Sequence, residues 1–275
     1  MNFFKLFPTI PVDLQKDGRV NQMVHTFKSV RPLQNFIDQP SLYTFYEIQN
    51  GERPDIVSQR LYGTSEYYWT FFVINEFLHD GYRAWPMSQE VAAKYIEEEY
   101  SGYVITTSPS ISRDSDGAIS EFSNSLQGEN RNFVVTDGTR FKLNETITGS
   151  ISGASGTLKK KNSDLNQLIV KDVTGVFQTN ENIDGGTSQA SVESYQVYKY
   201  ADAPHHFFKI GDAEERTITP RDYINSPLAE STNNYTFKSN RQYIMDKNEE
   251  RSSIRVLQPE YISQFVEEFE NLINE

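Results

Sequence analysis

The sequence predicts an α+β protein, with a mixed α/β module, a small inserted all-β domain of barrel or sandwich type, and extended N- and C-terminal segments. Three observations support this class. Strand-like and helix-like patterns alternate within residues 41–105, residues 131–197 carry short β-type runs separated by Gly and Ser, and the last residues have helical spacing. The 275 residues, 37% of them hydrophobic, are enough to bury a sizeable core.

The composition narrows the functional classes. A net charge of −12 argues against sequence-independent binding to DNA or RNA, because the phosphates would be repelled. The chain has no cysteine, which excludes disulfides and thiolate metal sites and fits assembly in a reducing cytoplasm. No run approaches the roughly 18 apolar residues that span a bilayer, and the N-terminal segment lacks the pattern of a signal peptide. We therefore expect no nucleic-acid partner and no membrane partner.

Residues 1–40 are predicted to form an extended N-terminal arm. Pro8, Pro11, Pro32 and Pro40 interrupt its apolar residues, and this spacing favours an arm that lies on a partner over a compact domain. An ordinary irregular terminus is the alternative, and the sequence leaves both open.

Residues 41–105 are predicted to form a compact mixed module. Tyr43–Ile48 is aromatic and β-branched, as in a strand, and Gln49–Gly51 is a turn signal. Pro54 suits the first turn of a helix, and Gly63 can end that helix because glycine adopts positive φ without strain.

The same module continues with two further helices. Residues 66–77 have helical spacing, residues 79–86 are predicted to be a loop, and Ser88 can cap the helix that follows. Trp69 and Leu61 occupy the apolar positions of their helices. We therefore expect both side chains in the core of the module.

The amino-acid composition changes in the middle of the chain. Residues 106–130 are rich in Ser, Asp, Asn and Gly, which predicts a linker, and residues 131–197 contain an internal repeat with an offset of 36 residues. The matching positions are Phe141/Phe177, Asn144/Asn180, Glu145/Glu181, Ile147/Ile183, Gly149/Gly185, Ser152/Ser188, Ala154/Ala190 and Ser155/Ser191. Each copy is predicted to be a hairpin, and two hairpins can close a small barrel or sandwich. We expect residues 131–197 to fold on their own.

Residues 198–275 are predicted to end in a strand, Ser253–Leu257, and an amphipathic helix after Pro259. The apolar stripe of this segment is expected to bind a partner, and burial in the protein's own core is the alternative. The predicted partner-binding residues are Ile254, Val256, Leu257, Tyr261, Ile262, Phe265, Phe269 and Leu272. The glutamates on the opposite helix face favour a basic neighbour.

The residues that most often carry catalysis or metals are sparse. His205 and His206 are adjacent and would point to opposite faces of a strand, while His25 and His79 are isolated. The glutamate runs beginning at Glu97 and Glu267 could supply an acid–base pair for glycoside cleavage, but such runs are usually the solvated face of a helix. We predict no catalytic residues, no metal site and no cofactor.

One set of residues resembles the LysM module, a family with a strand, two helices and a second strand that binds glycans. The set comprises Tyr46, Ile48, Gly51, Glu52, Val57, Ser58, Leu61, Trp69 and Asn75. The turn after the first strand reads Gly51-Glu52-Arg53-Pro54, where the family usually has Gly-Asp-Thr-Leu. The family's usual closing strand is also replaced, and both changes fall near its sugar groove.

A second resemblance covers more of the chain. Residues 51–77, Trp85–Ser88, Lys94–Ile96 and Ser253–Phe265 together resemble the baseplate wedge subunit encoded by gene 53 in contractile-tailed phages of the T-even type. The resemblance implies a structural virion protein of the tail baseplate, assembled in host cytoplasm, that clamps neighbouring wedges by contacts with other baseplate wedge proteins. It also implies six copies, or a multiple of six, per baseplate. A peptidoglycan-binding LysM protein associated with a tail lysin is the alternative.

Overall fold

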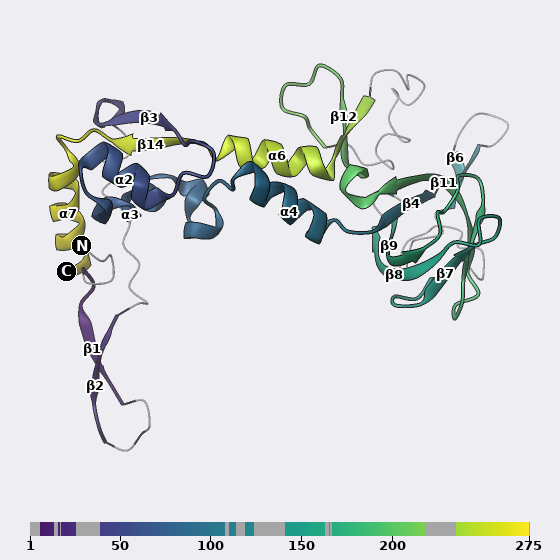
Figure 1. The fold of residues 1–275 in the computed structure, drawn as a ribbon, viewed down its shortest axis with the longest axis horizontal. Helices are drawn as coiled ribbons and strands as arrows, with labels where there is room; N and C mark the ends of the chain where they lie inside the picture. Colours follow the sequence, from purple (N-terminus) through teal and green to yellow (C-terminus); the bar gives the residue numbers. More distant parts are fainter. Residues whose placement is uncertain are drawn as a thin grey trace. The chain divides into compact units, whose positions relative to one another are not determined.

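The computed structural model gives a mixed α and β fold, as predicted, in two compact units (Figure 1). The described residues are 6–13, 16, 18–25, 39–107, 110–113, 119–123, 141–162, 165, 167–217 and 235–274. The first unit comprises Met1–Ala92 and Asp246–Glu275, and the second comprises Ala93–Met245. The sequence of the second unit thus lies between the two segments of the first.

The first unit combines short strands with helices. Its elements are β1 (Thr9–Val12), β2 (Asn21–Val24), η2 (Pro40–Leu42), β3 (Tyr43–Glu47), α2 (Pro54–Tyr62), η3 (Ser65–Tyr67), α3 (Trp69–Ile74), η4 (Glu76–Leu78), η5 (Gly81–Arg83), β14 (Ser253–Leu257) and α7 (Ile262–Asn274). Two more helices, α4 (Gln89–Glu99) and α6 (Asn240–Glu250), cross the boundaries between the units. Within the predicted arm, β1 and β2 form an antiparallel hairpin with Thr9 opposite Val24.

The helices of the first unit follow their local signals, with one difference. Helix α2 begins at Pro54 and ends at Gly63, whose φ is 72°. The helix predicted over residues 66–77 is divided, and its α-helical part is only α3. It ends because Asn75 has extended backbone angles and its side-chain amide donates to the Phe71 carbonyl, 2.9 Å away.

Strands β3 and β14 join the two sequence segments of the first unit. They pair antiparallel without a bulge, with Tyr43 opposite Leu257 and Glu47 opposite Ser253. Two core clusters pack around this pair. The α7 cluster contains Leu6, Trp69, Ile74, Leu257, Ile262, Phe265, Val266, Phe269 and Ile273. The Trp85 cluster contains Ile48, Val57, Phe71, Leu78, Ala84, Trp85, Ile254 and Val256.

The second unit contains a closed six-stranded barrel (Figure 1). Around the barrel, the strands are β10 (Asn182–Gly185), β11 (Ser191–Lys199), β4 (Tyr103–Thr107), β9 (Gln167–Thr174), β8 (Ser155–Asn162) and β7 (Thr146–Gly149). The remaining elements are β5 (Ser110–Arg113), β6 (Ile119–Ser123), η6 (Tyr200–Asp202), β12 (Pro204–Lys209) and β13 (Tyr235–Ser239). β5 pairs with β6, and β12 pairs with β13.

The barrel is built around the sequence repeat. Strands β7 and β8 of the first copy correspond to β10 and β11 of the second, and β7 pairs antiparallel with β10. Even the bulges correspond, since the register shifts between Leu158 and Lys160 in β8 and between Ser194 and Gln196 in β11. Strand β9 lies beside β8, and β4 takes the equivalent place beside β11. The barrel therefore has approximate twofold symmetry.

Strand β4 changes the predicted boundaries. It pairs with both β9 and β11, although its residues precede the repeat in the chain and fall across the predicted module and linker. The barrel thus begins before residues 131–197, and that segment alone lacks one of its six strands. Residues 124–140, which include most of the predicted linker's second half, lie outside the described residues.

The barrel interior repeats as well. Phe141 and Phe177, Ile147 and Ile183, and Ala154 and Ala190 are equivalent pairs, and all six side chains are buried in one cluster. Gly149 illustrates how closely the copies meet, because a Cβ placed there would lie 2.6 Å from the carboxylate oxygens of Glu181. Glycine is required at this position for that approach.

Candidate functional site

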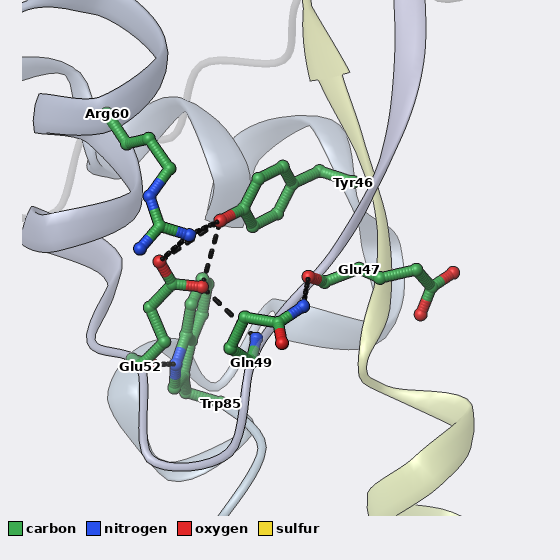
Figure 2. A network of polar contacts seen from close by, with 6 residues as sticks. All are labelled: Tyr46, Glu47, Gln49, Glu52, Arg60 and Trp85. Carbon is green, nitrogen blue, oxygen red and sulfur yellow. Dashed lines mark hydrogen bonds and ion pairs between the residues drawn. The ribbon is translucent and has the colours of Figure 1, made fainter.

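The turn between β3 and α2 is fixed by a polar cluster around Glu52, which we call the Glu52 network (Figure 2). Gly51, with a φ of 74°, lets the chain reverse so that the Glu52 amide donates to the Gln49 carbonyl at 2.9 Å. The turn directs the Glu52 side chain back toward β3 and α2. Its carboxylate accepts hydrogen bonds from the Tyr46 hydroxyl at 2.9 and 3.0 Å and from the Gln49 amide at 3.1 Å.

Charge in the Glu52 network is balanced by Arg60 from α2. The guanidinium Nη1 lies 2.8 Å from Glu52 Oε1 and also donates to the Tyr46 hydroxyl oxygen at 2.7 Å. The Glu52 side chain is only 5% exposed, so an unpaired carboxylate there would be costly. Burial, followed by the contact with Glu52, raises the pKa of the Tyr46 hydroxyl. The hydroxyl therefore stays protonated and acts as a donor.

The Glu52 network also forms a hydrogen bond with the loop before α4. The Trp85 indole N–H donates to the Glu52 carbonyl at 2.7 Å, and the Trp85 ring lies in a core cluster. One residue thus links β3, α2 and the loop before α4. We interpret the cluster as a structural element that holds three segments together, because its carboxylate is engaged by side-chain and main-chain donors.

A second polar arrangement covers the outer edge of β14. Asn75, which is 1% exposed, accepts from the Arg255 amide and donates to the Arg255 carbonyl, each at 2.9 Å. Its amide therefore bonds to the main chain as a neighbouring strand would. The Tyr62 hydroxyl donates to the Leu257 carbonyl at 3.0 Å, and burial raises the pKa of that hydroxyl. The edge of β14 that faces away from β3 is thereby occupied at Arg255 and at the Leu257 carbonyl.

The residues predicted to bind a partner lie mostly inside the first unit. Ile254 and Val256 belong to the Trp85 cluster, and Leu257, Ile262, Phe265 and Phe269 belong to the α7 cluster. Tyr261 and Leu272 are half-buried. The ring centroids of Trp69 and Phe269 are 4.8 Å apart, which shows how directly α7 packs on α3.

The buried positions change which residues of the C-terminal segment can contact a partner. Six of the predicted residues fill the protein's own core, which is the alternative that the sequence left open. Side chains in that core cannot also form a surface patch. A partner contact stays a prediction for the half-buried Tyr261 and Leu272. Trp69 is buried as predicted, whereas Leu61 is half-buried at the margin of the Trp85 cluster.

Two further glutamates are buried in the barrel, at equivalent positions of the repeat. Glu145 accepts from the amides of Lys142, Thr187 and Ser188 and from the Ser188 hydroxyl. The second glutamate makes the equivalent contacts with the first copy: Glu181 accepts from the amides of Gln178, Ile151 and Ser152 and from the Ser152 hydroxyl. Each copy of the repeat thus holds a loop of the other.

The pKa values of these two glutamates differ from that of a free carboxylate. Burial by itself raises the pKa of each, but the hydrogen bonds from the main chain and from Ser188 or Ser152 outweigh it, so both pKa values lie below the ordinary value. The matching Glu and Ser positions were visible in the sequence repeat, but their reciprocal contacts depend on closure of the barrel.

The adjacent histidines depart from the predicted geometry. A bulge between Pro204 and His206 in β12 removes the alternation of faces, and the Nδ1 atoms of His205 and His206 lie 2.9 Å apart. The prediction that they point to opposite faces is therefore wrong. His205 stacks on Tyr243, and burial is the main cause that lowers the pKa of both histidines.

Among the described residues, no group of three or more His, Cys, Asp or Glu side chains is placed to hold a metal ion. Within the same residues, the helices are too short or too polar for any to cross a bilayer.

Residues 4–113 match the family model described as base plate wedge protein 53. This range contains the β1–β2 hairpin, the Glu52 network and barrel strand β4, but not β14, α7 or the repeat. No curated protein matches the chain. The similarity to the phage baseplate wedge family that the sequence predicted is confirmed over residues 4–113.

Proposed function

We propose that this protein is a structural component of a phage tail baseplate wedge, where it holds neighbouring wedge proteins together through protein–protein contacts. The observation that carries the proposal is the family match over residues 4–113. In this proposal the protein is present in six copies or a multiple of six per baseplate and is assembled in host cytoplasm, as the resemblance in the sequence implies. Its module of β3, α2, α3 and β14 serves as a LysM-like docking scaffold in this proposal.

The N-terminal hairpin is the surface that best fits such contacts. It lies within the matched range, and all four residues of β2 are exposed. Its apolar side chains include Met23, 41% exposed, and Val24, 37% exposed, and the neighbouring Val20 is 60% exposed. Apolar side chains that a chain leaves exposed next to one another on one element are typical of protein interfaces.

The test is reconstitution with the other wedge proteins of the same phage. We expect the purified chain to co-sediment with at least one of them, and Met23→Ser with Val24→Ser to weaken that complex while the melting temperature stays near wild type. Val176→Ser changes an exposed apolar residue of the second unit and serves as the matched control. A wild-type chain that binds no wedge protein would contradict the proposal, and equal binding by the double variant would exclude the hairpin as the contact.

A peptidoglycan-binding role is the second candidate, favoured by an exposed aromatic side chain, Tyr82, beside two half-buried rings. Tyr82 is 59% exposed, and its ring lies 5.5 Å from that of Phe72 and 6.0 Å from that of Tyr68. Retention on purified peptidoglycan that is lost in Tyr82→Ala would support this role. Against it, Glu52, at the position where the LysM turn usually has Asp, is engaged in the Glu52 network.

A further inference from the structure

The two long edges of the β3–β14 sheet differ, among the residues that the structure describes. On the outer edge of β14, Asn75 engages both main-chain groups of Arg255, and the Tyr62 hydroxyl engages the Leu257 carbonyl. On the other side, β3 pairs with β14 alone, and Phe45 at its centre is 74% exposed. An uncovered strand edge is a template for pairing with another strand.

The alternation of hydrogen bonds between β3 and β14 identifies the main-chain groups along the open edge of β3. The Ile48 amide donates to the Ser252 carbonyl, and the Gln258 amide donates to the Leu42 carbonyl. Even-numbered residues of β3 therefore bond toward β14, since antiparallel pairs alternate. The odd-numbered residues Tyr43, Phe45 and Glu47 direct their main-chain N–H and C=O groups away from β14.

Two of these six outward groups have partners within the chain. The Tyr43 N–H donates to the Pro40 carbonyl, and the Glu47 carbonyl accepts from the Gln49 side chain at 3.1 Å. In the described contacts, four groups stay unpaired: the N–H and C=O of Phe45, the C=O of Tyr43 and the N–H of Glu47. Their order along the strand reads acceptor, donor with acceptor, donor.

This pattern is complementary to itself. We propose that β3 pairs with β3 of a second copy of this chain, antiparallel and centred on Phe45, to form a continuous four-stranded sheet across a twofold axis. Each Phe45 then exchanges two hydrogen bonds with its counterpart, and each Glu47 N–H donates to the Tyr43 carbonyl of the other copy. The two groups already engaged, Tyr43 N–H and Glu47 C=O, would face each other, so no outward group lacks a partner.

The side chains agree with this arrangement. The two Phe45 rings become a cross-strand aromatic pair, which is a stabilising combination in antiparallel sheets. Each Glu47 comes opposite Tyr43 of the other copy, and the guanidinium of Arg255 lies 5.8 Å from the centre of that ring. A carboxylate and a guanidinium therefore lie on either side of the Tyr43 ring at both ends of the interface. The strand has no bulge, lysine or proline, which are the usual features that keep strand edges apart.

The interface is symmetric, as in most homodimers, and the inference does not rest on the proposed wedge function. The test uses the purified full chain in sedimentation experiments over a range of concentrations. We expect wild type to form a dimer and Phe45→Lys to be monomeric at the same concentrations, because two ammonium groups would face each other. Phe77→Lys, at an apolar residue that is 46% exposed in the same unit, should leave the dimer intact.

A cross-link gives a second measurement that does not depend on the lysine variant. The chain has no cysteine, so Phe45→Cys introduces a single thiol. Directly opposite hydrogen-bonded residues have Cα atoms about 5.5 Å apart, a separation that a disulfide spans. We expect oxidised Phe45→Cys to become a covalent dimer and Phe77→Cys to stay monomeric on denaturing gels. A monomeric wild type, a dimer that persists in folded Phe45→Lys, or a dimer without the Phe45→Cys cross-link would each overturn the proposal.

Discussion

The two units bury glutamate side chains by different means. In the first unit, Glu52 is neutralised by the guanidinium of Arg60, whose side chain is 55% exposed. In the barrel, Glu145 and Glu181 instead accept hydrogen bonds from main-chain amides and a serine hydroxyl of the other repeat copy. A repeated sequence can supply the donors for a buried carboxylate from its own symmetry, whereas Glu52, which occurs once, shares its carboxylate between a cation and the Tyr46 and Gln49 donors.

The units also close differently. The first unit closes when β14, near the end of the chain, pairs with β3. The barrel closes when β4, which precedes the repeat, fills the place beside β11. Both closures join segments that are far apart in the sequence. The loss of a partner strand should affect the barrel most, because the closed barrel has no sheet edge and removal of a strand creates unpaired edges.

Removal of β4 is the change with the largest expected effect. A fragment of residues 131–197 lacks that strand, so we now expect no cooperative thermal transition, in contrast to the expectation from the repeat alone. A fragment of residues 101–200 retains all six strands and should melt cooperatively. Circular dichroism of both fragments measures this difference. A cooperative melt of the shorter fragment would mean that five strands close without β4.

The apolar stripe of α7 provides the next largest effect. Phe269 is buried against Trp69, so Phe269→Ala should lower the free energy of unfolding of the first unit by about 3–5 kcal/mol. Leu272→Ala, at a half-buried position of the same helix, should have a smaller effect. Denaturant titration followed by tryptophan fluorescence compares them. If Phe269→Ala keeps wild-type stability, α7 does not pack on this core in solution.

Symmetry of the barrel can be tested at its two glutamates. Glu181→Gln places an amide N–H₂ among main-chain donors, so some of the hydrogen bonds to this buried group are lost. We expect the free energy of unfolding to fall by about 1–3 kcal/mol. Glu145→Gln should cost a similar amount, because its contacts are equivalent. Thermal or chemical unfolding of both variants gives the comparison. A loss confined to one variant would show that the two halves are not energetically equivalent.

The same glutamates give a pH dependence. Their pKa values are lower in the folded protein than the ordinary value of 4.5. The stabilisation is therefore present above about pH 4.5 and is lost as the pH falls through the folded values. The Gln variants should lose stability less steeply than wild type over that acidic range. Parallel curves for wild type and variants would contradict this assignment.

Arg60 should show the smallest effect. Arg60→Ala removes a half-exposed cation but leaves the Tyr46 and Gln49 donors on Glu52, so we expect a loss of about 1 kcal/mol or less. The loss should shrink as salt is added, unlike that of the barrel variants, because their glutamates are held by main-chain donors. Unfolding at low and high ionic strength measures this contrast. A salt-independent loss would indicate that Arg60 acts through packing.

Local signals in the sequence predicted much of the structure. Pro54 and Gly63 bound α2 because their backbone preferences act within one turn, and the repeat predicted a small barrel or sandwich because its hydrophobic pattern occurs twice. The use of β4 could not be predicted, since its partners are far away in the sequence. The sequence also could not decide whether α7 packs on a partner or on the protein itself, because an apolar stripe predicts burial but does not say which surface covers it.

Several site features also depended on tertiary contacts. The bulge that brings His205 and His206 together has no local sequence signal, and neighbouring residues of a regular strand would point to opposite faces. Asn75 is one of the LysM-like positions in the sequence, but its bonds to Arg255 form only when β14 pairs with β3. The family similarity was predictable because residues 51–77 carry a dense set of matching positions within the confirmed range.

The place of β4 in the barrel has a consequence for synthesis of the chain. Tyr103–Thr107 is translated long before β11, which begins at Ser191. At about 5–20 residues per second, roughly 4–17 seconds pass between the two strands. During that interval the nascent chain carries an apolar, β-prone segment that lacks both of its neighbours until β9 is made, and then still lacks β11. Ribosome-bound intermediates of this protein should therefore bind chaperones most strongly before the second repeat copy emerges.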